Sequence, residues 1–186
     1  MNKDRFLAFT DAIVAIIMTI MVLEVKIPVG PTFKSLSQEA PYFLAFIVSF
    51  MIICSAWYYH HYLFAHSKLI SRKIYWVNCI WLLSMAFFPV ATGWVSEFPL
   101  KREPGYFYFG IYIIWAILFY VLNRMTEKFN RGGNSSKGLE LVKTNTTNYG
   151  LDAGLFLLGA VGIYFWAPMA LLVTVLHALS WNLHGN

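Results

Sequence analysis

The sequence contains few charged residues: only 12% of its 186 residues are charged, 59% are hydrophobic, and the mean hydropathy is +0.58. A soluble globular domain carries roughly 25% charged residues, so this composition excludes an ordinary soluble fold and indicates an integral membrane protein. The basic residues lie between apolar runs. Membrane topology therefore explains the net charge of +5, and we expect no nucleic-acid partner.

Cysteine is scarce too, and the histidines are not accompanied by the further ligands that a metal site needs. Cys54 and Cys79 both lie inside apolar runs, which excludes a disulfide framework and a cysteine-based zinc site. His60 and His61 are adjacent, so on a helix their side chains point about 100° apart and cannot both bind one metal ion. We expect no metal site.

The familiar cofactor and filter motifs are absent as well. The chain has no GxxxxGK[ST] loop and no GxGxxG turn after a strand, so no nucleotide cofactor is expected. It also lacks the Thr-Val-Gly-Tyr-Gly segment of conventional potassium filters. A carbonyl-lined filter of that kind is therefore excluded.

The chain does contain long apolar runs separated by proline and glycine. A membrane-spanning helix needs about 20 mostly apolar residues, and this length predicts six spans in one all-α transmembrane domain covering 1–186. The glycines of the fifth span indicate close helix packing. The six predicted spans are 5–27, 41–64, 74–95, 105–124, 148–165 and 167–183.

The distribution of Lys and Arg predicts the orientation of these spans. With six spans, ten basic residues fall on the side that holds both termini and the polar loop 126–147, and four fall on the other. By the positive-inside rule both termini are cytoplasmic. The first span lacks the pattern of a cleaved signal peptide, so we expect it to be retained in a multi-pass protein of the cell membrane.

Two charges, Arg5 and Asp11, begin the first span, where an unpaired charge in the bilayer costs several kcal/mol. They lie about 240° apart around a helix, so each needs a partner from another helix. Polar residues at the same depth in the membrane as Asp11 occur at the end of the second span and at the start of the third. We therefore expect its partner to lie there. The candidates lie in the segments 57–61, which begins with Trp57 and ends with His60 and His61, and 76–78, which contains Trp76 and Asn78. Together they predict a polar network that fastens three helices.

From the residues alone, two further features each allow two interpretations. Ile16, Ile20 and Leu23 recur at helical spacing, with Thr19 beside them, which is typical of a packing stripe or a lipid-facing surface. Asp152 starts the fifth span, where it either benefits from the helix dipole or pairs with a base such as Arg5.

The first helix also carries a recognisable motif. Arg5-x-x-x-Phe9-Thr10-Asp11 and the apolar run to Pro28 resemble the RxxxFSD first helix of the transmembrane protein 175 family of potassium channels. The resemblance continues in 57–64 and from Trp76 to Pro89, and so covers the first half of the chain. Thr10 stands where the motif has serine; both residues supply a hydroxyl.

The resemblance implies a homotetramer of single-repeat chains, as in prokaryotic members, with the first helix of each chain lining a central pore. It assigns the constriction to Ile16, further rings to Ile20 and Leu23, and adjacent polar lining to Thr19. Arg5, Phe9, Thr10 and Asp11 would then belong to the network that holds this helix. The implied function is potassium permeation through a hydrophobic gate, with K⁺ as the permeant ion, no cofactor and no enzymatic activity.

Two other hypotheses compete with the channel. A small membrane enzyme or a proton- or metal-coupled transporter would use His60, His61 and Asp11. An accessory membrane subunit would use none of these residues chemically.

Overall fold

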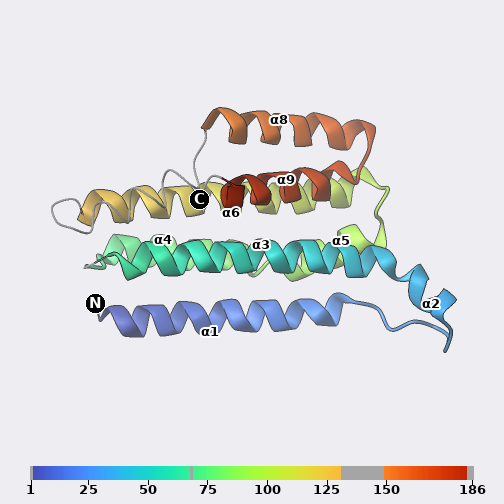
Figure 1. Ribbon diagram of the computed structural model, residues 1–186, viewed down its shortest axis with the longest axis horizontal. Coiled ribbons are helices and arrows are strands. Elements are labelled where there is room, and N and C mark those ends of the chain that lie inside the picture. The colour runs from blue at the N-terminus through green and yellow to red at the C-terminus, as the bar shows by residue number, and fades with distance from the viewer. Residues whose placement is uncertain (1, 68, 131–148, 184–186) are drawn as a thin grey trace.

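A computed structural model describes residues 2–67, 69–130 and 149–183 of the chain (Figure 1). Every regular element in these ranges is helical, which confirms the all-α prediction. Most of the predicted polar loop lies outside the described residues. The elements are α1 (Lys3–Met21), η1 (Val22–Glu24), α2 (Phe33–Gln38), α3 (Ala40–Ala65), α4 (Arg72–Met85), α5 (Phe88–Glu97), α6 (Arg102–Asn130), α8 (Tyr149–Phe165) and α9 (Met169–Leu183).

Four helical segments in the described ranges are long and apolar enough to cross a membrane. They are Lys3–Glu24, Ala40–Ala65, Arg72–Glu97 and Arg102–Asn130, of 22 to 29 residues. α8 and α9 are apolar but shorter, with 17 and 15 residues. Both coincide with predicted spans, so the multi-pass membrane fold is supported although two of its helices fall short of the usual spanning length.

The third predicted span, 74–95, falls within the apolar segment Arg72–Glu97, but this segment consists of two helices rather than one. α4 ends at Met85, α5 begins at Phe88, and Pro89 occupies the first turn of α5. Proline has no N–H to donate to the carbonyl of Met85, four residues earlier, and its ring crowds that carbonyl. The span is therefore divided by a turn at residues 86–87.

α6 extends beyond its predicted end at residue 124 and reaches Asn130. The Asn130 amide accepts from the N–H of Leu69 at 3.1 Å and donates to the carbonyl of Leu69 at 3.3 Å. Lys3 at the start of α1 donates to the carbonyls of Ala65 and Ser67 at the end of α3. These bonds gather the start of α1, the end of α3 and the end of α6 at one end of the molecule.

The helices lie nearly parallel to one long axis, with α1 along one edge of the view and α8 along the other (Figure 1). The core between α4, α5 and α6 is aromatic, and Trp81, Phe88, Trp115 and Phe119 are all almost completely buried. The Trp81 and Trp115 rings stack at 6.2 Å, and Phe88 meets Trp115 edge-on at 5.6 Å. This core fixes the middle of the bundle and leaves α1 at its margin.

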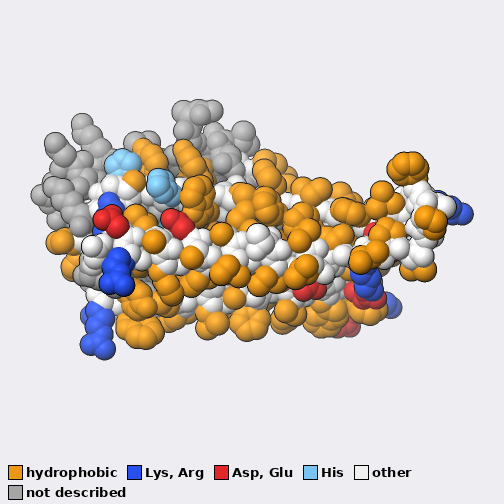
Figure 2. All heavy atoms as spheres, turned by 90° about the horizontal axis from the view of Figure 1, so that it is seen from below, with side chains coloured by type: hydrophobic (Ala, Val, Ile, Leu, Met, Phe, Trp, Pro, Cys, Tyr) orange, Lys and Arg blue, Asp and Glu red, His pale blue; other side chains and the backbone are white. Residues whose placement is uncertain are grey.

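The face that includes α1 is hydrophobic along most of its length, and charged side chains gather near its two ends (Figure 2). Inside the bundle, by contrast, polar groups bond to one another. Ser49 of α3 bonds Thr92 of α5 at 2.8 Å and Tyr108 of α6 at 2.9 Å, and all three are buried. Lipid offers no hydrogen bonds, so such internal pairing is what a membrane-embedded bundle requires.

Candidate functional site

α1 has two faces with different environments. Its buried residues, which contact α3, α4 and α5, recur at helical spacing and are Phe6, Thr10, Val14, Ile17 and Met21. The predicted stripe lies on the other face, where Ile16 is 56% exposed, Ile20 43% and Leu23 77%. The stripe is therefore not part of the core of its own chain, and it faces away from the helices that hold α1.

Thr19 is the polar member of this exposed face. Its hydroxyl donates to the carbonyl of Ile16, one turn earlier on the same helix, at 2.8 Å. The donor is thus satisfied within α1, while the oxygen lone pairs remain on the exposed side. The face combines three bulky aliphatic side chains with one hydroxyl oxygen.

The buried face of α1 is fastened by a chain of hydrogen bonds through three helices. Asn78 of α4 donates its amide N–H to Thr10 Oγ1 at 2.9 Å, and Asn78 Oδ1 lies 2.9 Å from His60 Nε2 of α3. Since Asn78 Oδ1 accepts, His60 must carry its proton on Nε2. All three side chains are completely buried.

His60 is held on its faces by aromatic rings. It stacks on Trp81 with a 5.1 Å separation between ring centroids and an interplanar angle of 1°, and it contacts Phe64 at 4.6 Å. Its Nδ1 has no hydrogen-bond partner in the described part of the chain. The geometry is that of a neutral histidine enclosed in a core.

Asp11 has its partner in the segment 57–61, where the sequence predicted it, but at Trp57 rather than at His60 or His61. Asp11 accepts from the indole N–H of Trp57 at 2.8 Å. The Arg5 side chain forms no hydrogen bond or ion pair with another described residue; it lines a hollow of about 340 Å³ with Phe9 and Tyr75. The neutral Thr10, rather than either charge, links α1 to His60.

The remaining predicted residues lie at the edge of this network. His61 is exposed and packs against Trp57 at 5.7 Å. Trp76 is exposed and meets Tyr75 edge-on at 5.5 Å, while Phe9 packs on Tyr75 at 6.3 Å. His60, His61 and Asp11 therefore do not converge on one point, and no metal-binding cluster occurs among the residues described.

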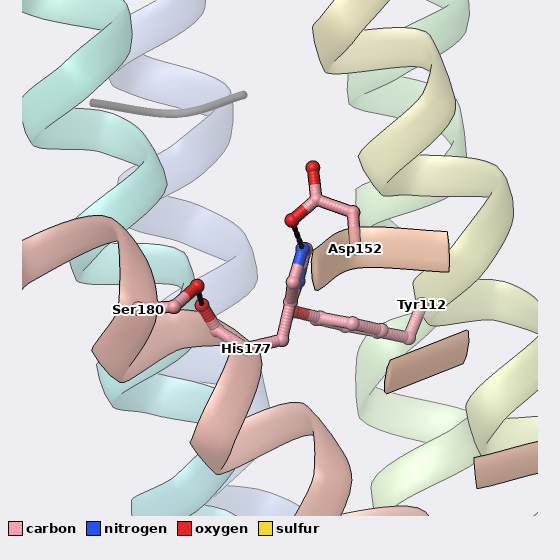
Figure 3. A network of polar contacts seen from close by, with 4 residues as sticks. All are labelled: Tyr112, Asp152, His177 and Ser180. Atoms are coloured by element: carbon pink, nitrogen blue, oxygen red, sulfur yellow. Dashed lines mark hydrogen bonds and ion pairs between the residues drawn. The ribbon is translucent and has the colours of Figure 1, made fainter. Parts of the chain in front are cut away.

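A second polar network, which the sequence did not reveal, joins α6, α8 and α9 (Figure 3). His177 Nε2 donates to Asp152 Oδ1 at 3.0 Å, and the Tyr112 hydroxyl donates to His177 Nδ1 at 2.5 Å. His177 is 2% exposed. Asp152 thus has a partner in α9, an outcome that the sequence left open; the signal available was a lone histidine in an otherwise apolar helix.

An ionic cluster fastens the chain where it leaves α1. Glu97 at the end of α5 binds the ammonium of Lys26 and accepts from the Tyr42 hydroxyl of α3. The Lys26 ammonium also lies 5.3 Å from the centre of the Tyr42 ring. The hydrogen bond to Glu97 raises the pKa of Lys26 above its ordinary value. α1 is fixed at both ends.

Comparison with known proteins gives the context of this site. The model of the family described as "Endosomal/lysosomal potassium channel TMEM175" matches residues 5–89, which contain α1 and the Thr10–Asn78–His60 chain. A protein of Chryseobacterium sp. (strain P1-3) named as a potassium channel is 33% identical over 97% of this chain and 93% of its own length. A second potassium channel, of Chamaesiphon minutus, is 28% identical over 97% of this chain and 96% of its own.

Similarity also extends to an animal protein and to a solved structure. The human protein named endosomal/lysosomal proton channel TMEM175 is 29% identical over 56% of this chain, which spans only 23% of that protein. The crystal structure of a TMEM175 homologue from Chamaesiphon minutus matches with a TM-score of 0.80, covering 99% of this chain and 98% of that one at 24% identity. That structure shares the fold over nearly the whole length.

Proposed function

Because this chain belongs to the TMEM175 family of potassium channels, we propose that it is a potassium-permeable cation channel whose ions pass along the exposed face of α1. The observation that carries the proposal is the exposure of Ile16, Ile20 and Leu23 on a helix whose opposite face is buried. Ion channels are not enzymes, so no catalytic residues are assigned.

One chain cannot enclose a pore with a single helix face, so several copies must meet along α1. A closed ring with rotational symmetry brings the same residues of each copy together around one axis. We propose a homotetramer, as the family resemblance implies. Ile16 then forms the constriction, Ile20 and Leu23 form further rings, and Thr19 adds hydroxyl oxygens.

A narrow aliphatic ring disfavours water, so a passing ion must keep or shed its hydration shell at a cost that depends on its hydration energy. Potassium holds water less tightly than sodium and loses less on entering such a ring. This difference gives the direction of the ion preference without a carbonyl filter. The proposed mechanism is a hydrophobic gate whose diameter determines which ion passes more readily.

The charges at the two ends of the bundle support the orientation. Arg72, Lys73 and Lys128 lie at the end where α1 begins, and Lys34 and Lys101 lie at the other. By the positive-inside rule the end with the first residues of α1 is cytoplasmic. We propose a six-span topology with both termini in the cytoplasm of a cell-membrane protein, in which α8 and α9 supply the last two spans.

In this proposal the Thr10–Asn78–His60 chain fixes the rotation of α1. A helix that turned about its axis would break the bond of 2.9 Å between Asn78 and Thr10 and would move Ile16 away from the pore axis. Asp11 and Trp57 add a second contact on an adjacent face. The network is thus structural, and it determines which side chains meet the ions.

The test is potassium flux into liposomes that contain the purified protein. The wild type should pass K⁺ faster than Na⁺, and Ile16→Ala, which widens the ring, should increase flux and reduce the preference for K⁺. Ile114→Ala on α6 is the matched control, because Ile114 is 52% exposed and lies outside the proposed pore face. If liposomes with wild-type protein were no leakier than empty ones, the channel function would be wrong; if Ile16→Ala behaved like Ile114→Ala, the constriction would lie elsewhere.

A further inference from the structure

A hollow with three basic side chains opens between the start of α4 and the end of α6. Its volume is about 690 Å³, and Arg72, Lys73 and Lys128 line it together with Ile74, Met125 and Phe129. These residues come from two helices that pack against each other. The hollow is far along the chain from the ion-conducting face of α1 and belongs to neither polar network.

The three basic side chains of this hollow form no hydrogen bond or ion pair with any other described residue, and its lining contains no carboxylate. Like charges gathered in this way repel one another, so the isolated chain holds an unfavourable arrangement that an anion would relieve. The hollow also lies at the N-terminus of α4, which Ser71 caps and where the helix dipole favours negative charge. The hollow is therefore suited to an anionic group.

The surface next to the hollow is apolar. A second hollow of about 590 Å³ shares Arg72, Lys73 and Met125 and adds Trp76 and Val77. Trp76 is 56% exposed and lies about one turn further along α4 towards the middle of the bundle. An occupant of both hollows has a charged end and a hydrocarbon part.

We propose that these hollows bind an anionic phospholipid, with its phosphate headgroup among Arg72, Lys73 and Lys128 and an acyl chain against Trp76, Val77 and Met125. The site lies at the end of the bundle that carries most of the basic residues, where anionic lipids of the cytoplasmic leaflet are attracted. A soluble phosphate would satisfy the charges but would leave the apolar wall uncovered. A phospholipid would neutralise the charges and cover the apolar wall, and it would bridge α4 and α6.

The test is competitive lipid binding to the purified oligomer, measured by native mass spectrometry with phosphatidylglycerol and phosphatidylcholine of the same acyl chains. The wild type should retain phosphatidylglycerol at least about tenfold better than phosphatidylcholine, and Lys73→Gln with Lys128→Gln should abolish most of that preference. The control is Lys34→Gln with Lys101→Gln, which removes the same charge from the opposite end and should leave the preference intact.

Inorganic phosphate separates a lipid site from a general anion site. Excess phosphate at constant ionic strength should not displace bound phosphatidylglycerol, and Trp76→Ala should weaken its retention while all three cations remain. The proposal would be overturned if both double variants bound lipid equally, or if phosphate alone displaced the lipid. Potassium flux is not the readout, so failure here would leave the channel function untouched.

Discussion

At the scale of single residues, the buried polar side chains that link α1 to α3 and α4 are neutral, although α1 carries four charged residues. A buried charge must be compensated fully, whereas a hydroxyl, an amide and an imidazole satisfy one another with ordinary hydrogen bonds. Thr10, Asn78 and His60 are completely buried and do so. Arg5 lies in the first turn of α1, where it lines a hollow with Phe9 and Tyr75.

Removing the Thr10 hydroxyl tests the contact between α1 and α4. Thr10→Val keeps the shape of the side chain but leaves the Asn78 amide without its acceptor, so we expect a loss of about 1 kcal/mol in stability. Thr10→Ser keeps the hydroxyl and is the matched control. Thermal unfolding in detergent, followed by tryptophan fluorescence, measures both; equal stability of the two variants would contradict the role of the hydrogen bond.

Removing His177 tests the second network. His177→Ala leaves the Tyr112 hydroxyl and the Asp152 carboxylate without the partner between them, and buried polar groups deprived of partners cost about 1–3 kcal/mol each. We expect unfolding at a clearly lower temperature. Asp152→Asn retains an oxygen that accepts from His177 and should lose much less. The prediction fails if the asparagine variant is as unstable as the alanine variant.

At the scale of elements, the glycines of α8 differ in what surrounds them. A Cβ added at Gly159 would overlap the ring of Phe109, which is 2% exposed, whereas a Cβ at Gly154 would meet nothing within 4 Å. The prediction that glycine allows close helix contact therefore holds at Gly159 and not at Gly154 within one chain. The two positions form a natural pair for comparison.

Gly159→Ala should force the buried Phe109 ring to move, and overpacking of this kind costs about 1–3 kcal/mol. Gly154→Ala should be neutral or slightly stabilising, because alanine favours the helix by about 1 kcal/mol. Denaturation of each variant in a series of detergent and denaturant mixtures measures the change in its free energy of unfolding. A neutral Gly159→Ala would show that α6 and α8 pack less closely than the structure has them.

At the scale of the whole molecule, the proposed pore requires several copies of the chain, because one exposed helix face cannot enclose it. Leu23, 77% exposed, should lie near its equivalents in other copies if α1 surrounds a pore. In a background of Cys54→Ala and Cys79→Ala, Leu23→Cys should form disulfides between chains under mild oxidation. Non-reducing gels of the membrane-embedded protein would reveal them as cross-linked dimers.

Leu157→Cys on α8 is the control for this experiment, because Leu157 is 68% exposed but lies on the opposite edge of the bundle from α1 (Figure 1). It should remain monomeric on the gel. Cross-linking through Leu157 and not through Leu23 would place the subunit contact on α8 and would refute the arrangement around α1.

The sequence predicted the membrane class, the all-α fold and the importance of the first helix. It placed the partner of Asp11 in segments that include Trp57 without singling that residue out, and it left the partner of Asp152 open; the structure gives Trp57 and His177. Helical spacing states which side chains share a face, but partners come from other helices, and their rotation and depth depend on packing. The turn at residues 86–87 could have been foreseen from Pro89, since proline cannot continue the hydrogen-bonding pattern of a helix.

What the sequence determined by itself is therefore what depends on local composition: the few charges and the long apolar runs predicted an all-α, multi-pass membrane protein. Only the tertiary structure decided which face of α1 is buried and which is exposed. The burial of Thr10 against Asn78 and the exposure of Ile16 follow from the docking of α1 on α3 and α4. The spacing of side chains along one helix is the same whichever face of that helix is buried. Contacts with other helices therefore decide which face is buried and which is exposed.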